Sequence, residues 1–362
     1  TEGGGINIFN RNTKQISYLT HDTNNPNSLS SNNVKSLIKD SAGNFWVGTH
    51  GNGINFLNPK VKPYKFYHFE NSASNEIDIK EHIILSIFED INKNIWIGTS
   101  TQGLVLYNHE SDSFSKLDES YKSINCIVQS KNPNILLIGG NNGFEKVNIN
   151  TRQTIKINYN NQQNKSSISK SVNCIYEDED ENYWIGTEGQ GLVFYNQSNK
   201  STTNYGISQG LPNEVIYSIL PDKNNLWIST NQGLSKLNLD TEKIVNFDVS
   251  DGLQSNEFNY GASLKTDSGE IMFGGANGLN YFHPNKIIEN TFIPPIDIHT
   301  LKISNKPFLK ITDSISKVVL KYNQNDFSLD FTALGFSQSN KNKYAYKLEG
   351  FDPDWNYIGN KK

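Results

Sequence analysis

The densest group of side chains that could do chemistry is the acidic run Glu177-Asp178-Glu179-Asp180-Glu181. Clustered carboxylate oxygens bind hard cations, so a calcium site is one interpretation of this run. Its spacing does not match an EF-hand loop, and no glycine interrupts it. The run also falls where the chain is expected to turn between two strands. We therefore interpret it as a solvated turn, with a calcium site as the alternative.

The histidines and cysteines form no recognisable catalytic or metal-binding set. His50 has no second histidine at ligand spacing, so we expect it to be a surface residue. Cys126 and Cys174 are expected to be small apolar fillers with free thiols, because equivalent positions on neighbouring repeats lie too far apart for a disulfide. No Gly-x-Ser-x-Gly elbow and no Cys–His pair at a known spacing occurs. The sequence predicts no catalytic residue, no metal and no cofactor.

Composition and charge exclude further classes of function. The formal net charge is -4, so there is no basic stripe for binding a nucleic acid. No apolar run of about 18 residues occurs, so no segment is expected to span a membrane. Thr1 begins in the middle of a repeated phrase, so we interpret the chain as a piece of a longer protein. The absence of a leader therefore says nothing about the compartment.

A short phrase, with glycine in five of its six copies, recurs along the chain and defines the elements that must position any site. Its second residue, usually Trp, stands 41 to 50 residues from the next one. The phrase occupies residues 45–49, 95–99, 136–140, 183–187, 226–230 and 271–275. A period of this length with short strands is typical of a β-propeller. The sequence predicts an all-β fold with about six full four-stranded blades, preceded by strands C and D of a partial blade.

The second repeat illustrates the expected strands: A at 83–88, B at 95–99, C at 104–107 and D at 114–117. A glycine before each strand C is expected to adopt positive φ in a tight turn: Gly53, Gly103, Gly143, Gly191, Gly233 and Gly278. A phosphate-binding loop is the alternative, but no helix follows these glycines. Strand A carries a small residue that we expect near the propeller axis: Ser36, Ser86, Cys126, Cys174, Ser218 and Ala262.

The repeat stops after Pro284, and a second pattern begins. Residues 285–295 resemble a linker and end in two prolines. Residues 296–303, 318–322, 327–331 and 343–348 then alternate apolar and polar side chains. Such short strands predict the start of an Ig-like β-sandwich. The expected domains are a propeller over 1–284, a linker over 285–295 and a sandwich over 296–362.

These phrases carry a resemblance to a known family. Residues 33–40 with 43–49 and Gly53-Ile54 resemble the two-component regulator propeller repeat, and residues 251–259 with 274–284 resemble its last blade. Residues 331–336 and 344–355 are similar to the opening of the three-tyrosine (Y_Y_Y) domain that follows such propellers. Leu137, Met272 and Ser229 depart from the repeat phrase.

The resemblance implies that the chain is a sensor region of a hybrid two-component histidine kinase of the Bacteroidetes type. In that family the region is periplasmic, in an inner-membrane protein, and many members sense breakdown products of polysaccharides. It implies an oligosaccharide or other small ligand, a homodimer through the sandwich, and signalling through a rearranged dimer. The membrane segment and the kinase domains would lie outside this chain, so no enzymatic activity is expected here.

We expect the ligand on the propeller face where the B–C turns and the D–A connections meet. Amides and carboxylates there could bond sugar hydroxyls, although Asn also caps turns for purely local reasons. The candidate ligand-binding residues are His50, Asn52, Gln102, Asn141, Glu188, Gln190, Asn213, Glu214, Asn231, Gln232, Asn256, Glu257 and Asn259. Two alternatives remain open: a propeller enzyme such as a polysaccharide or glycoside lyase, and an interaction scaffold without a small ligand.

Overall fold

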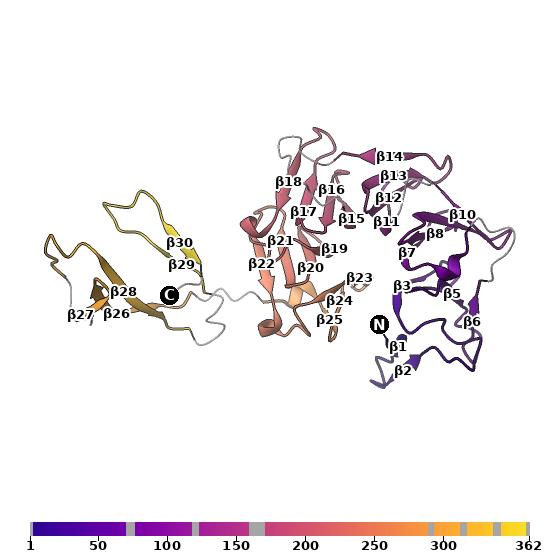
Figure 1. Ribbon diagram of the computed structural model, residues 1–362, viewed down its shortest axis with the longest axis horizontal. Helices are drawn as coiled ribbons and strands as arrows, with labels where there is room; N and C mark the ends of the chain where they lie inside the picture. The colour runs from indigo at the N-terminus through magenta and orange to yellow at the C-terminus, as the bar shows by residue number, and fades with distance from the viewer. Residues whose placement is uncertain are drawn as a thin grey trace. The chain divides into compact units, whose positions relative to one another are not determined.

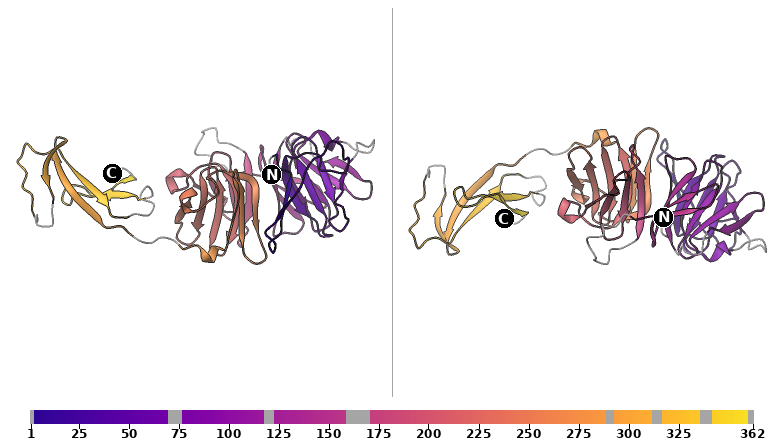
Figure 2. Two further views of the ribbon diagram at one scale, coloured as in Figure 1. Left: turned by 90° about the horizontal axis from the view of Figure 1, so that it is seen from below. Right: turned by 90° about the horizontal axis from the view of Figure 1, so that it is seen from above.

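The computed structural model describes residues 3–69, 77–117, 123–158, 171–288, 293–311, 317–335 and 342–359 of the 362-residue chain. The chain folds as two compact units, Thr1–Lys286 and Ile287–Lys362. Strands joined by turns make up both units (Figure 2). No helix of the described residues is long and apolar enough to cross a membrane. The helical segments are short 3-10 turns: η1 (Ile79–Glu81), η2 (Ile207–Gln209), η3 (Val249–Asp251) and η4 (Pro284–Lys286).

The first unit confirms the predicted all-β propeller: its antiparallel sheets fan about a common centre, with the first strand of each sheet innermost (Figure 1). Among the described residues, five blades have four strands and the sixth has three. A hairpin of β1 (Ile6–Phe9) and β2 (Ile16–Leu19) precedes them, where strands C and D of a partial blade were predicted.

The blades follow one another in chain order, and strands A to D of each pair in sequence. Blades 1 to 3 consist of β3 (Val34–Lys39), β4 (Phe45–Thr49), β5 (Ile54–Leu57) and β6 (Phe66–His68); β7 (Ile84–Glu89), β8 (Ile95–Thr99), β9 (Leu104–Asn108) and β10 (Ser113–Lys116); and β11 (Ile124–Gln129), β12 (Ile135–Gly140), β13 (Gly143–Asn148) and β14 (Thr154–Ile157). Blades 4 to 6 consist of β15 (Val172–Glu177), β16 (Tyr183–Thr187), β17 (Leu192–Tyr195) and β18 (Thr202–Tyr205); β19 (Ile216–Asp222), β20 (Asn225–Thr230), β21 (Gly233–Asn238) and β22 (Ile244–Phe247); and β23 (Phe258–Lys265), β24 (Ile271–Gly275) and β25 (Gly278–Phe282).

Small residues on strands A and B let successive blades approach each other. A Cβ on Gly48 of strand B would lie 2.3 Å from the Oγ of Ser36 and 2.5 Å from a methyl carbon of Ile84 on the next blade. The glycine of the repeated phrase therefore makes room for the neighbouring inner strand. The Trp of the same phrase fills the apolar layer between blades, since Trp46 shares a buried cluster with Ile84 and Val105 of blade 2.

The last residue of the phrase and the glycine before strand C fix the B–C turn. Thr49 donates from Oγ1 to the carbonyl oxygen of Gly53 at 2.9 Å, and Thr99, Thr187 and Thr230 make the same bond. A Cβ on Gly53 would lie 2.6 Å from the carbonyl oxygen of Ile79. Positive φ is confirmed at every glycine for which it was predicted: Gly53, Gly103, Gly143, Gly191, Gly233 and Gly278.

The second unit contains two small antiparallel sheets among its described residues. One consists of β27 (Lys306–Lys310), β26 (Ile296–Ile303) and β28 (Phe327–Ala333), and the other of β29 (Tyr344–Tyr346) and β30 (Asn356–Gly359). A ring contact of 5.1 Å between Phe331 and Tyr344 joins the two sheets. The Ig-like sandwich remains a prediction. Residues 289–292 of the predicted linker and Phe336 of the Y_Y_Y-like phrase lie outside the described residues.

One predicted strand of this unit is wrong. Residues 318–322 were predicted as a strand, yet they form no strand in the structure, and Val319 and Tyr322 are exposed. An alternating run becomes a strand only where a neighbouring strand pairs with it and a face is buried. Strand β26 instead pairs with β28 and with β27, whose sequence contains Pro307.

Candidate functional site

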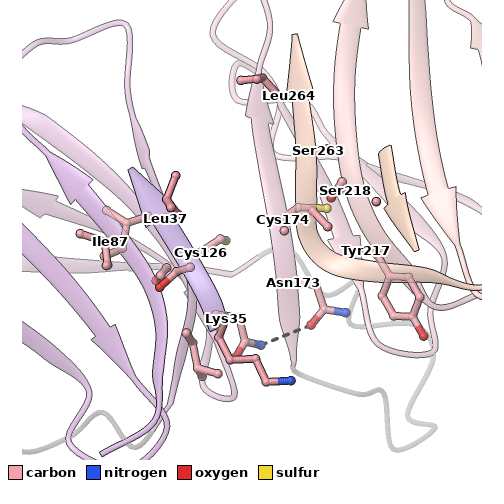
Figure 3. Close-up of a pocket in the computed structure, with 18 of the residues that line it drawn as sticks. Lys35, Leu37, Ile87, Cys126, Asn173, Cys174, Tyr217, Ser218, Ser263 and Leu264 are labelled. Atoms are coloured by element: carbon pink, nitrogen blue, oxygen red, sulfur yellow. Dashed lines mark hydrogen bonds between the residues drawn. The ribbon is translucent and has the colours of Figure 1, made fainter. Parts of the chain in front are cut away.

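The inner strands enclose a channel at the hub of the propeller, with a volume of about 660 Å³ (Figure 3). Strand A of every blade contributes to its lining. Figure 3 places Lys35, Asn173 and Tyr217 toward one end of the channel, and Leu37 and Leu264 toward the other. We call the first end the channel mouth. Because its lining is polar, a polar ligand would enter the channel there.

A β-bulge at the same place in five inner strands directs the side chains of the mouth. The pairing of β3 with β4 passes from Val34 to Ser36, which leaves Lys35 as the extra residue. An extra residue in an antiparallel pair bends the strand and re-aims its side chain, and bulges are frequent beside functional sites. The extra residues all line the channel, and we call them the bulge ring: Lys35, Leu85, Asn125, Asn173 and Tyr217.

The two amides of the bulge ring link three blades. Asn125 donates from Nδ2 to Oδ1 of Asn173 at 3.3 Å and to the carbonyl oxygen of Val172 at 3.1 Å (Figure 3). Asn173 donates in turn to the carbonyl oxygen of Ile216 at 3.1 Å. These bonds hold blades 3, 4 and 5 in register at the channel mouth. The amides therefore have a structural role, and they also form one wall of the mouth.

An aromatic pair and a carboxylate form the neighbouring part of the mouth. The rings of Tyr217 and Tyr260 lie 4.3 Å apart at an interplanar angle of 60°. Tyr260 is 50% exposed and donates from its hydroxyl to Oε1 of Glu188 at 3.5 Å. Burial, followed by the nearby charge of Glu188, raises the pKa of Tyr260 to about 12. Its phenol thus stays protonated at neutral pH and can donate a hydrogen bond, while its exposed ring can pack against a flat ligand.

The predicted ligand-binding residues lie at the same end of the blades as the bulge ring. Strand A begins where strand B ends, as in the pairing of Val34 with Thr49, and the amide of His50 bonds the carbonyl of Asn33 at 2.9 Å. The exposed members of the predicted set are His50, Asn52, Asn141, Glu188, Gln232, Asn256, Glu257 and Asn259. The part-buried members are Gln102, Gln190, Asn213, Glu214 and Asn231.

Several of these side chains stabilise their own turns. Asn213 accepts from the amide of Val215 at 2.7 Å, and Asn256 accepts from the amide of Val249 at 2.9 Å. Two others reach across to a neighbouring segment: Asn141 accepts from the hydroxyl of Ser171 at 3.4 Å, and Glu188 accepts from Tyr260. Glu188 is thus linked to the channel mouth through Tyr260, whose ring contacts the lining residue Tyr217, whereas Asn213 and Asn256 act as turn caps.

The acidic run at residues 177–181 has a mainly structural role. Asp178 accepts bonds from both the amide and the side chain of Asn182, so it closes the predicted A–B turn. Glu177 corrects the expectation of a solvated run, because it is buried and accepts from the amide of Lys131 at 2.6 Å. Among the described residues no cluster of three or more His, Cys, Asp or Glu could hold a metal ion.

Both cysteines line the channel and are free, as predicted. Burial raises the pKa of Cys126 to about 12, so its sulfur is present as the thiol at neutral pH. Burial also raises the pKa of Cys174, with the neighbouring Cys126 as a further cause. Protonated thiols are poor nucleophiles, which fits the interpretation of both residues as small fillers.

The sequence interpretation missed the bulge ring and Tyr260. A bulge depends on how two strands pair, so the sequence of either strand alone does not show it. One signal was nevertheless present: each member of the ring directly precedes the small residue of strand A. The residue type at that position differs between blades, being Lys, Leu, Asn or Tyr, while the next residue is small in every blade. A position that varies inside an otherwise uniform repeat is a candidate for specificity.

The repeats match a known family model. The model described as "Two component regulator propeller" matches residues 28–51, 78–101, 166–189 and 210–232. These matches end in the B–C turns of blades 1, 2, 4 and 5, just after B strands that each have Trp in the repeated phrase. Blades 3 and 6, where Leu137 and Met272 replace Trp, are not matched. The chain therefore carries two-component regulator propeller repeats.

The chain is similar to two proteins that are named as parts of histidine kinase or two component systems. The chain is 28% identical to histidine kinase P4 of Formosa agariphila over 99% of this chain and 27% of that protein. It is 29% identical to the extracellular domain of the hybrid two component system BT3049 of B. thetaiotaomicron, with a TM-score of 0.71 over 99% of this chain and 48% of that one. The chain thus spans about a quarter of the kinase and about half of the solved domain.

A further structural likeness concerns the fold alone. Virginiamycin B lyase of Staphylococcus aureus is 16% identical, with a TM-score of 0.56 over 76% of this chain and 86% of that one. At this identity the propeller architecture is common to the two proteins, and function does not follow from it.

Proposed function

We propose that this chain is the ligand-sensing part of the ectodomain of a hybrid two-component sensor histidine kinase, located in the periplasm. The observation that carries the proposal is a similarity over 99% of this chain to an extracellular domain of such a system, at 29% identity and a TM-score of 0.71. The similarity to a histidine kinase over 99% of the chain supports the same assignment. Kinase chemistry belongs to other parts of the protein, and this chain supplies recognition.

We propose an oligosaccharide as the ligand. Sugar rings present hydroxyl groups at their edges and flat C–H faces, so they are recognised by amides and carboxylates beside an exposed aromatic ring. Asn125 and Asn173 line the channel mouth, and Tyr260 with its partner Glu188 lies beside it, against the lining residue Tyr217. The channel volume of about 660 Å³ lies in the usual range for small-molecule sites.

Signalling would pass through a homodimer formed by residues 296–362. This part of the chain exposes several large apolar side chains, among them Ile296, Phe308, Tyr322 and Tyr357. Exposed apolar surface of this kind is typical of protein contact sites. Ligand bound to the propeller would then change how two copies pair, and membrane segments elsewhere in the protein would transmit that change.

Binding of oligosaccharides to the whole chain tests the proposal. A ligand that binds only the folded state stabilises it by about 2.7 kcal/mol at 100 times its dissociation constant, so thermal unfolding should shift upward for one oligosaccharide class. Sedimentation of the same samples should show a dimer whose pairing responds to that ligand. Absence of any shift across neutral and acidic oligosaccharides would contradict the ligand assignment. Turnover of the bound sugar would instead favour a propeller lyase.

A further inference from the structure

Blade 5 departs from the other blades beside the channel mouth. Strand B has a glycine facing the small residue of strand A in five blades: Gly48, Gly98, Gly139, Gly186 and Gly274. Blade 5 instead pairs Ser218 with Ser229. The next inner strand has a longer bulge, because the pairing of β23 with β24 passes from Phe258 directly to Ser263. A larger side chain at position 229 is therefore accommodated where the neighbouring strand leaves its regular course.

Three buried polar atoms at this place have no hydrogen-bond partner among the described residues: Ser218 Oγ, Ser229 Oγ and Asn231 Oδ1. Ser218 is 3% exposed and Ser229 is 1% exposed. In blades 1 and 2 the equivalent serines donate to the next inner strand, from Ser36 to Ile84 at 3.3 Å and from Ser86 to Ile124 at 3.4 Å. Blade 5 has lost this bond.

Unsatisfied buried hydroxyl groups are costly, and native proteins seldom keep them without a reason. Ser218 lines the channel directly, and so does the adjacent Tyr217, whose ring contacts Tyr260. Ser229 pairs with Ser218 on the neighbouring strand, and Glu188 is linked to this part of the mouth through Tyr260. We call the group Ser218, Ser229, Asn231, Tyr260 and Glu188 the blade-5 junction.

The charge of the junction narrows the kind of ligand it fits. Glu188 and Glu257 both lie close enough to Tyr217 to act on its phenol electrostatically. The cation of the bulge ring, Lys35, belongs to blade 1, whereas Glu188 follows strand B of blade 4 and Glu257 precedes strand A of blade 6. An anionic ligand would be repelled by two carboxylates, whereas a neutral polyhydroxylated ring would not.

We propose that the blade-5 junction is a subsite for one neutral sugar ring, which packs on Tyr260 and bonds its hydroxyls to Glu188 and to the channel-lining Ser218. The paired Ser229 lies behind Ser218 and positions it for this bond. The proposal rests on the proposed function, because it assumes that the chain binds an oligosaccharide. It goes further by naming the blade, the residues and the charge class of the sugar. In this view blade 5 has Ser229 in place of the glycine of the other blades because the serine contributes to ligand recognition.

Substitutions at Tyr260 and Ser229 in the whole chain test the subsite, with short neutral gluco-, xylo- and galacto-oligosaccharides and oligogalacturonides as probes. Tyr67→Ala is the matched control for Tyr260→Ala, since Tyr67 is 53% exposed and makes one edge-on ring contact, with Phe69 on the outer side of blade 1. Ser229→Gly restores the residue of the other blades, so it should fold normally and keep or raise the melting temperature. Calorimetry should give a dissociation constant at least tenfold weaker for Tyr260→Ala, about tenfold weaker for Ser229→Gly, and unchanged for Tyr67→Ala.

Two results would overturn the subsite while leaving the sensor proposal intact. One is a wild-type chain that binds neutral sugars with affinities unchanged by Tyr260→Ala and Ser229→Gly, which would indicate that the orphan hydroxyls hold water only. The other is binding of oligogalacturonides alone. A wild-type chain that binds none of the probes would overturn both the subsite and the proposed oligosaccharide ligand.

Discussion

At the residue scale, an aspartate at the end of strand A closes the turn to strand B. Asp40 accepts three bonds, from the amide and the side chain of Asn44 and from Nε1 of Trp46 at 3.0 Å. Asp90 accepts the same three bonds in blade 2, from the amide and the side chain of Asn94 and from Nε1 of Trp96 at 2.8 Å. The carboxylate thus joins a polar turn to the tryptophan that fills the layer between blades. A side chain in a turn and a side chain in the core are stabilised together.

Asp40→Asn should remove this connection, because an amide offers one acceptor where the carboxylate offers two and places its own donors against Asn44. We expect a loss of about 1–3 kcal/mol in unfolding free energy, the usual range for bonds to a charged group. Burial acts to raise the pKa of Asp40, yet the bonds from Asn44 and Trp46 outweigh it and lower the pKa below 3.8. A carboxylate whose pKa is lowered in the folded state stabilises the fold at pH values above its pKa in the unfolded state. This stabilisation is lost as the pH falls through the pKa of the folded state.

The difference between wild type and Asp40→Asn should therefore be constant at neutral pH and shrink as the pH falls below 3.8. Urea denaturation at several pH values measures this difference. Asp180→Asn is the control, since Asp180 is exposed in the corresponding turn of blade 4. Equal effects of the two substitutions would show that the bonds of Asp40 contribute nothing particular.

At the element scale, the B–C turns depend on a glycine that combines positive φ with close packing. Gly191 has φ +71°, and a Cβ there would lie 2.2 Å from the carbonyl oxygen of Tyr205. Gly189 in the same turn has φ +106° and nothing within 4 Å of such a Cβ. Gly189→Ala should therefore cost about 1 kcal/mol for backbone strain alone, and Gly191→Ala clearly more, because the strand D end must also move. Thermal unfolding of both variants checks the order, and an equal loss would count against the close packing.

At this scale the strands of the repeat could be predicted from the sequence, whereas the bulges between paired strands could not. The strands of the second repeat lie within one residue of their predicted starts, because alternation, turn residues and the glycine are local signals. The bulge ring escaped prediction because Lys35 or Asn125 becomes an extra residue only relative to its partner strand. Residues 318–322 failed for a related reason, since they pair with no strand in the part of the chain that the structure describes. Sequence periodicity thus predicts a strand's face more reliably than its neighbours.

At the scale of the whole molecule, the repeats make a nearly uniform ring, and several of its departures from uniformity lie in two neighbouring blades. The ends of the ring approach each other, since Arg11 in the β1–β2 turn bonds Glu270 before β24 at 2.8 Å. The irregular inner strand β23, the orphan serines and Tyr260 all lie in blades 5 and 6. A scaffold of equal blades can tolerate such a local exception because the remaining interfaces keep the ring in place.

The two units differ in how much of their apolar surface is buried, and this difference predicts their order of unfolding. Four tryptophans of the first unit are buried between its blades: Trp46, Trp96, Trp184 and Trp227. In the second unit the described residues include few buried apolar side chains, notably Leu301 and Tyr344, while Trp355 is 58% exposed. Units with few buried contacts open at lower free energy. We therefore expect residues 287–362 to unfold first in urea, with amide exchange in β26 and β28 faster than in β8 and β16.

A Trp355→Phe variant separates the two transitions, since its tryptophan fluorescence reports the propeller alone while circular dichroism reports both units. The fluorescence midpoint should then lie at a higher urea concentration than the first circular dichroism step. Coincident midpoints would mean that the units unfold together, which requires contacts that couple them. Such coupling would change the view of signalling, because ligand binding to the propeller could then stabilise the second unit directly. Independent unfolding would instead require the signal to travel as a change in the pairing of two copies.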